Sequence, residues 1–341
     1  MSPCLQRLAL AGAFLTLAAS AASAQTRYHV DDLGGTPSFG PRMTLNASGV
    51  GVGTLGVATL YDHGSVTQVR TAIGSSGSDG AGINDAGTVV GTSWDFGHNG
   101  TAWLYANGQY KRIGTAARFP GSHAIAAGIN NLGQVAGTLV FPGNVAHPFL
   151  WRNGKVIDLG MPEGSTGAWT QAINDHHVVV GSFNLPDFFG HAFAWENGVM
   201  HDLGLPGQAT QGTSVASGLN NAGTIVGSWF PDWGAPTHAV RWIKGSGVDL
   251  GVLPGSDGIS VAFAVNDAGT IVGQASMHLA DPVALAMVYD ASGMHDLNTL
   301  VDDTGAGWQL QIAYSINASG QILGVGRFGN ESHAFLATPL P

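Results

Sequence analysis

One segment recurs along this chain, and its most regular copy reads Ala216-Ser217-Gly218-Leu219-Asn220-Asn221-Ala222-Gly223-Thr224-Ile225-Val226-Gly227. The first asparagine of the segment anchors seven copies, which lie 38 to 51 residues apart at Asn46, Asn84, Asn130, Asn174, Asn220, Asn266 and Asn317. A period near this length is typical of β-propellers, in which each repeat forms one blade of four strands. We therefore expect an all-β fold of seven equivalent units.

The copy that ends near Leu250 divides into four short strands. Residues 215–219 are small and apolar, and Asn220-Asn221-Ala222-Gly223 forms a hairpin turn in which glycine is free to adopt positive φ. We expect further strands over residues 224–229, 238–243 and 248–250.

Because successive strands reverse direction, the asparagine turns and the later Asn-Gly turns share one side, the turn face. The loops between second and third strands and between blades share the other side, the loop face.

The two ends of the chain hold complementary parts of one copy. The last copy ends with His333-Ala334-Phe335-Leu336 and lacks the Asp-Leu-Gly strand, which Tyr28-His29-Val30-Asp31-Asp32-Leu33-Gly34 matches. In a ring this pairing would leave no exposed strand edge, whereas an open solenoid would need polar capping repeats. We therefore predict a seven-bladed β-propeller of four-stranded blades, closed by the N-terminal strand completing the last blade.

Residues 1–24 have the composition of a secretory signal peptide. Arg7 supplies a positive charge, Leu8 begins an apolar run to Leu17, and Ala22-Ser23-Ala24 forms a small-residue cleavage site. The apolar run is too short to span a bilayer as a finished helix, and the alternative is a retained membrane anchor. We predict a secreted protein, periplasmic or extracellular, without a membrane span in the mature form. Residues 25–341 would then form a single propeller domain.

Composition excludes several classes of partner and chemistry. The one cysteine, Cys4, lies in the predicted signal peptide, so disulfides, thiol catalysis and cysteine-ligated zinc are excluded from the mature chain. A net charge of −10 with 12 basic residues argues against a nucleic-acid surface, which needs clustered lysine and arginine. No Asp-x-Asp-x-Asp calcium loop is present in the sequence. We predict no nucleic-acid partner, no metal site and no cofactor.

The combination of Ile-Asn-x-x-Gly-x-Val-x-Gly with His-Ala-Phe-x-Trp resembles the HAF repeat, a bacterial extracellular repeat family. The name motif is intact at His191-Ala192-Phe193 and His333-Ala334-Phe335, and nearly so at His147-Pro148-Phe149 and His238-Ala239-Val240. It is altered at Thr101-Ala102-Trp103, Leu285-Ala286-Met287 and Ala58-Thr59-Leu60. The resemblance implies an exported protein and brings no catalytic residues. Because the histidines recur once per blade, we expect them to have a structural, hydrogen-bonding role.

Aromatic and acidic residues recur together in the loops between second and third strands. The predicted ligand-binding residues are Trp94, Asp95, Asp187, Phe188, Phe189, Phe230, Asp232 and Trp233. An aromatic side chain beside a carboxylate can stack on a sugar ring or peptide group and accept hydrogen bonds from it. The alternative is that the aromatic residues cover the blade tops while aspartate fixes the turn. The loops between blades add Asp79, Glu163, Asp257, Asp302, Asp303, Trp169 and Trp308 on the same face.

These features favour a binding or scaffold propeller that meets a glycan or peptide ligand through its loop face, without catalytic residues. One alternative is a polysaccharide hydrolase or lyase, which requires two converging carboxylates on that face. Another alternative is a structural envelope protein without a specific ligand. Sequence alone does not choose the ligand, because Asp95, Asp187 and Asp232 come from different blades.

Overall fold

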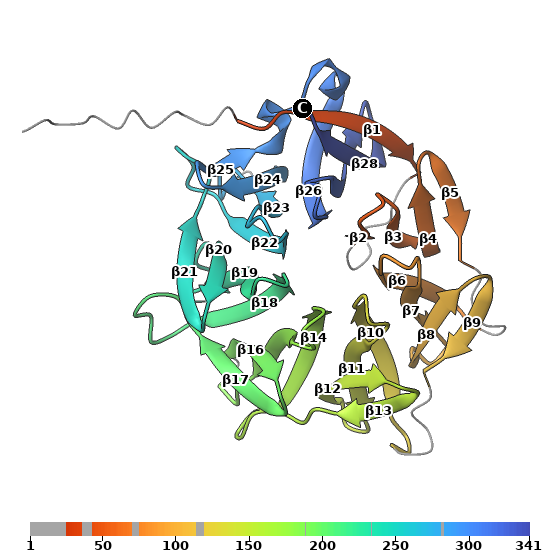
Figure 1. Ribbon diagram of the computed structural model, residues 1–341. Helices are drawn as coiled ribbons and strands as arrows, with labels where there is room; N and C mark the ends of the chain where they lie inside the picture. The colour runs from red at the N-terminus through yellow and green to blue at the C-terminus, as the bar shows by residue number, and fades with distance from the viewer. Residues whose placement is uncertain are drawn as a thin grey trace, which may run out of the picture.

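The structure is a computed structural model that describes residues 25–35, 43–69, 75–113, 119–187, 189–232, 234–280 and 283–341. The predicted signal peptide, residues 1–24, lies outside these ranges. The described residues form seven antiparallel sheets of four strands, arranged in a ring around a central axis (Figure 1). The prediction of a seven-bladed β-propeller is confirmed.

Each blade is named by its place in the ring, and its strands run from the axis outward. Blade 1 contains β2 (Thr44–Leu45), β3 (Gly51–Leu55), β4 (Val57–Asp62) and β5 (Ser65–Gln68). Blade 2 contains β6 (Gly77–Ile83), β7 (Val89–Trp94), β8 (Gly100–Ala106) and β9 (Gln109–Arg112). Blade 3 contains β10 (His123–Ile129), β11 (Val135–Phe141), β12 (Val145–Arg152) and β13 (Lys155–Asp158). Blade 4 contains β14 (Gly167–Ile173), β15 (Val179–Asn184), β16 (Gly190–Glu196) and β17 (Val199–Gly204). Blade 5 contains β18 (Thr213–Leu219), β19 (Thr224–Phe230), β20 (His238–Ile243) and β21 (Ser246–Gly251). The four strands expected in the fifth blade are all present, and three are longer than expected.

The last two blades follow the same order except at the chain ends. Blade 6 contains β22 (Ser260–Val265), β23 (Ile271–Ala275), β24 (Leu285–Asp290) and β25 (Gly293–Asp296). Blade 7 contains β26 (Trp308–Ile316), β27 (Ile322–Phe328), β28 (Glu331–Pro339) and, as its outer strand, β1 (Tyr28–Gly34). Two short 3-10 helices, η1 (Leu297–Thr299) and η2 (Asp303–Gly305), lie between the two blades. This connection accounts for the long spacing between the last two anchors.

The recurring glycine of the second strand and phenylalanine of the third strand are packing partners. Gly181 lies directly opposite Phe193 in the sheet, and Phe193 is completely buried. A Cβ on Gly181 would lie 1.9 Å from the Trp169 carbonyl oxygen and 2.8 Å from the Phe193 ring. Any larger residue would therefore push the inner strand and the ring apart. This close approach explains why Val-Gly and His-Ala-Phe recur together along the chain.

A ring of seven buried asparagines joins the blades on the turn face. Each Nδ2 donates to the backbone carbonyl oxygen of the corresponding asparagine in the next blade over 2.8–3.3 Å. The last bond, from Asn317 to Asn46, returns to the first blade. The Oδ1 atom caps the residue's own turn, as when Asn220 accepts from the Thr224 N–H at 2.8 Å. One side chain therefore serves both its hairpin and the contact between blades.

Histidine–aspartate pairs join the third strand to the outer strand in four blades. The bonds run through Nδ1 over 2.8–3.0 Å and join His147 to Asp158, His191 to Asp202, His238 to Asp249, and His333 to Asp32. Each aspartate also accepts from the N–H of the glycine two residues later, which explains the Asp-Leu-Gly pattern. The expectation that the motif histidines have a hydrogen-bonding role is confirmed. Hydrogen bonding to the partner aspartate raises the pKa of His191 and of His333.

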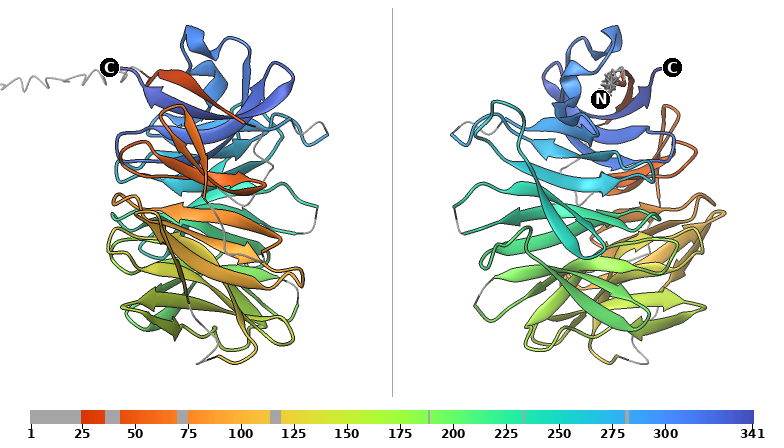
Figure 2. Two further views of the ribbon diagram at one scale, coloured as in Figure 1. Left: turned by 90° about the vertical axis from the view of Figure 1, so that its right-hand side faces the viewer. Right: turned by 60° about the vertical axis from the view of Figure 1, so that its left-hand side comes forward.

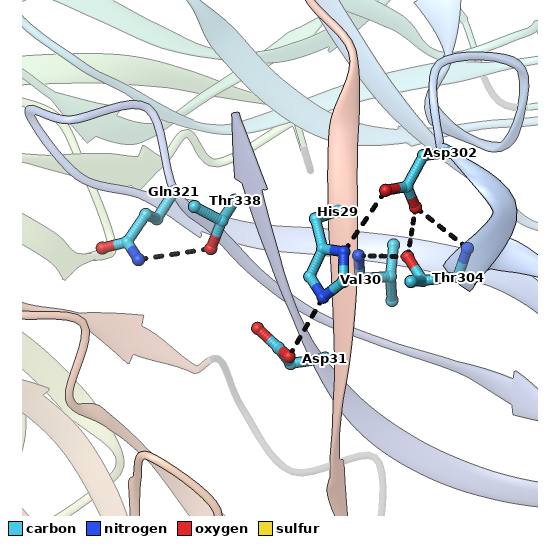
Figure 3. A network of polar contacts seen from close by, with 7 residues as sticks. All are labelled: His29, Val30, Asp31, Asp302, Thr304, Gln321 and Thr338. Carbon is cyan, nitrogen blue, oxygen red and sulfur yellow. Dashed lines mark hydrogen bonds and ion pairs between the residues drawn. The ribbon is translucent and has the colours of Figure 1, made fainter. Parts of the chain in front are cut away.

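The N-terminal strand β1 is hydrogen-bonded along both of its edges. On one edge it pairs with β28, from Tyr28 opposite Pro339 to Gly34 opposite Ala334 (Figure 2). On the other edge Tyr28 exchanges backbone bonds with Leu300 and Asp302. Beside it the Val30 N–H donates to the Thr304 hydroxyl over 2.8 Å, and His29 lies 3.3 Å from Asp302 (Figure 3).

Tyr28 anchors this strand in the core between blades 6 and 7. Its side chain is buried in a cluster with Val288, Leu297 and Phe335. Burial raises the pKa of Tyr28 to about 12. The strand therefore has both polar and apolar attachments to the C-terminal part of the chain. That this attachment is what closes the ring stays a prediction.

The asparagine ring is testable with Asn220→Ala, which is expected to destabilise the fold by about 2–4 kcal/mol in urea unfolding. The substitution leaves the Asn266 carbonyl and the Thr224 N–H without their partner, and each buried unpaired group costs about 1–3 kcal/mol. The neighbouring, exposed Asn221→Ala is the matched control and is expected to cost less than about 1 kcal/mol. Equal losses for the two variants would contradict the structural role of the ring.

The attachment of β1 is testable through pH. His333→Gln is expected to lower the melting temperature more at pH 5.5 than at pH 8.5. Because pairing with Asp32 raises the His333 pKa, the folded state binds this proton more tightly than the unfolded chain. The stabilisation is complete below the ordinary histidine pKa of about 6.5 and is lost as pH rises through the raised value.

The control for this experiment is His238→Gln, which removes the same pair from a blade whose strands are consecutive in sequence. At pH 5.5 it is expected to cost less than His333→Gln, because it does not join the two chain ends. A pH-independent loss for His333→Gln, or a larger loss for His238→Gln, would argue against closure through β1.

Candidate functional site

The loop-face end of the central channel contains a cavity of about 300 Å³ between blades 2, 3 and 4. Its walls come mainly from the inner strands of these blades, β6, β10 and β14. Asp79 of β6, Ile125 of β10 and Trp169 of β14 occupy the same register position, each opposite the residue that follows the second-strand glycine. Trp94, at the end of β7, adds a second indole to the lining.

Two of these residues are held together by a hydrogen bond. Trp94 Nε1 donates to Asp79 Oδ2 over 2.5 Å, so the carboxylate fixes the orientation of the indole. The other carboxylate oxygen makes no hydrogen bond to a described residue and remains available as an acceptor. The side chain of Trp169 is 37% exposed, which is unusual for a large aromatic residue on an inner strand. The cavity therefore contains both an open aromatic surface, from blade 4, and an oriented carboxylate, from blade 2.

The residues that build this cavity depart from the repeat. In blades 5 and 6 the register position of Asp79 and Trp169 is occupied by Val215 and Val261. The nearby threonines are engaged in structure, since the Thr138 hydroxyl accepts from the Thr170 N–H at 3.0 Å. Asp79 is the one carboxylate among the described residues that line the cavity.

The predicted site residues that the structure describes are distributed around the loop face, and among these Trp94 alone lines the cavity. Phe188 and Trp233 lie outside the described residues. Phe189 and Phe230 are half-buried, whereas Asp187 and Asp232 are exposed near the tips of their loops. The structure therefore does not bring the predicted set together at one point, and ligand binding by these residues stays a prediction.

Asp95 and Asp187 act within their own loops. Asp95 Oδ1 accepts from the backbone N–H groups of Gly97 and Asn99 at 2.8 and 2.9 Å. These hydrogen bonds lower the pKa of Asp95, and the bond from the Asn99 N–H has the largest effect. Asp187 accepts from the Phe189 N–H at 3.3 Å. Both aspartates therefore bond to backbone N–H groups of their own turns, as the alternative prediction of a turn-fixing role states.

Asp79 and Trp169 were expected in loops between blades, and this placement is wrong. Both lie within inner strands, β6 and β14, because these strands begin earlier than the repeat suggested. Asp302 bonds to His29 of the N-terminal strand, while Trp308 begins β26 after the connection from blade 6 and packs against Phe328 and Phe335. The signal that could have found the cavity is the replacement of valine by aspartate and tryptophan at one repeat position.

The fold is similar to two solved β-propellers. Oligogalacturonate lyase from Vibrio parahaemolyticus aligns with a TM-score of 0.57 and 10% identity over 92% of this chain and 91% of that chain. The β-propeller domain of the Trilobed protease from Pyrococcus furiosus aligns with a TM-score of 0.52 and 10% identity over 91% of this chain and 93% of that chain. At this identity the likeness shows the fold alone.

Sequence comparison adds no relative to these structures. No family model matches the chain, and no curated protein matches it significantly. Within the part of the chain that the structure describes, no helix has the length and apolar character needed to cross a membrane.

Proposed function

We propose that this chain is an exported binding propeller, without catalytic activity, that holds a glycan in the loop-face cavity formed by Asp79, Trp94 and Trp169. The observation that carries the proposal is one cavity lined by both the partly exposed Trp169 indole and the Asp79 carboxylate, which Trp94 fixes in place. An indole stacks on the apolar face of a sugar ring, and a carboxylate accepts hydrogen bonds from its hydroxyl groups.

Other loop-face residues support a partner on this side. The second-to-third loop of blade 6 carries three exposed apolar side chains, Met277, Leu279 and Val283. Exposed apolar side chains that gather within one loop favour an interaction surface. The cavity would provide specificity for one sugar ring, while this loop of blade 6 would contact the rest of the ligand.

The enzyme alternative is less well supported by the cavity. Glycoside hydrolysis uses a pair of carboxyl groups about 5–10 Å apart. The described cavity lining contributes one carboxylate, and its Oδ2 is bonded to Trp94. A binding function needs no second carboxylate, so it is the better account of this site.

The binding proposal is tested with a glycan array and a peptide library, followed by titration calorimetry on the best hit. Trp169→Ala is expected to weaken glycan binding at least about tenfold, or about 1.4 kcal/mol. Phe96→Ala removes an aromatic residue of the same face that does not line the cavity, and it is expected to leave the affinity nearly unchanged.

Trp94→Phe is a milder probe of the same site. It retains an aromatic ring but removes the Nε1 donor to Asp79, so we expect an intermediate loss of about threefold. Binding of peptides but no glycans through Trp169 would overturn the choice of ligand. Binding that depends on Phe96 and not on Trp169 would overturn the site.

Export is supported by the signal-like residues 1–24 and by the resemblance to the HAF repeat. We expect the protein expressed with these residues in a bacterial host to be recovered outside the cytoplasm with Gln25 as its first residue. Mass spectrometry of the intact protein measures this directly. A full-length mass in the membrane fraction would instead favour a retained anchor.

A further inference from the structure

A second and larger cavity, of about 530 Å³, lies between blades 4 and 5 and opens on the turn face. Its apolar wall includes Ala194 and Leu203 of blade 4 and Ile225 and Trp242 of blade 5. Its rim is formed by the turns that follow the inner and third strands, including His176 and Lys244. The volume lies in the ordinary range of small-molecule pockets, which is about 300–1,000 Å³.

The cavity is associated with a singular small residue at a position that is otherwise large. The third-strand position of Ala194 is occupied in the other blades by Leu60, Leu104, Leu150, Arg241, Val288 and Leu336. Leu104 and Leu336 pack against core residues of the next blade, whereas Ala194 leaves part of the corresponding space beside Trp242 empty. In a repeat protein, positions that recur have structural roles, so a departure that opens a pocket indicates a local function.

A second departure from the repeat lies on the rim of the same cavity. The fourth asparagine turn has His176-His177 where other turns have a small or apolar residue followed by glycine. His177 adopts φ 66° and its ring bonds to Gln134 at 2.7 Å in the neighbouring blade. The ring of His176 lines the cavity and makes no hydrogen bond or ion pair with a described residue.

Opposite charges flank the opening, one from each blade. Glu196 ends β16, and Lys244 follows β20 as one of only three lysines in the chain. Both are exposed and line the cavity, yet within the described ranges neither forms an ion pair with the other or with any further residue. A ligand with both charges could therefore engage each residue without breaking an existing pair.

We propose that this inter-blade cavity binds a small zwitterion with an apolar body, a dipeptide of apolar residues. The apolar side chains would occupy the space beside Ala194 and Trp242. The ligand carboxylate would pair with Lys244 and its ammonium group with Glu196, while His176 would contact the backbone between them. The site is independent of the loop-face cavity, which lies at the opposite end of the blades.

The proposal is tested with the dipeptide Leu-Leu, measured by titration calorimetry against the purified protein. Ala194→Leu introduces the residue that four other blades have at this position, and it is expected to weaken binding at least about tenfold by filling the cavity. The melting temperature is expected to stay the same or rise by a few degrees, because filling a cavity stabilises a fold. Leu-Leu that binds equally to this variant, or does not bind the unaltered protein at millimolar concentration, would overturn the proposal.

The charged rim is tested with exposed variants that do not touch the core. Lys244→Gln is expected to weaken Leu-Leu about tenfold but to leave the affinity for its C-terminal amide unchanged. Glu196→Gln is expected to weaken Leu-Leu about tenfold but to leave the affinity for N-acetyl-Leu-Leu, which lacks the ammonium group, unchanged. Lys155→Gln, a lysine next to the corresponding turn of blade 3, is the matched control and should have no effect. If the unaltered protein binds Leu-Leu, its C-terminal amide and N-acetyl-Leu-Leu with equal affinity, Lys244 and Glu196 do not pair with the ligand charges. That result would overturn the zwitterion assignment.

Discussion

The fold depends on one hydrogen bond that is repeated seven times, from a buried asparagine amide to the backbone of the next blade. A propeller blade is a small sheet that cannot be stable alone, so the ring requires a specific contact between neighbours as well as apolar packing. The asparagine supplies this contact and caps its own turn with the opposite end of the same amide. Alanine cannot do either, and aspartate lacks the donor, which is why asparagine recurs at all seven positions.

The rest of the repeat is explained by close packing around this ring. The second-strand glycine makes room for the third-strand phenylalanine, as at Gly181 and Phe193, and the histidine beside it pairs with the outer-strand aspartate. Side chains at these repeated positions are already used in packing or in hydrogen bonds within the fold, so they are not available to a ligand. Both candidate sites are instead built from departures, namely Asp79 and Trp169 on the loop face and Ala194 on the turn face.

The candidate site could be predicted from the sequence only in part. Trp94 was selected because it lies in a long loop beside an acidic residue, and it does line the cavity. Asp95 was selected for the same reason, but its carboxylate is used by the Gly97 and Asn99 N–H groups of its own turn. Local composition cannot distinguish these two outcomes, because both residue types serve turns and ligands equally well. The Ala194 cavity was not predicted, since an alanine in a strand carries no chemical signal by itself.

The sequence by itself determined the number of blades, the position of the asparagine turns and the hydrogen-bonding role of the motif histidines, because these follow from a pattern repeated along one chain. The bond from each asparagine to the next blade was found only in the structure, as was the packing of glycine against phenylalanine. Only the tertiary structure decided which side chains meet. Asp79, Trp94 and Trp169 come from three strands of two blades, and their place around one cavity depends on strand register and on how the blades are arranged in the ring. That information belongs to the ring as a whole, since neighbours across the channel are distant in sequence and share no local pattern.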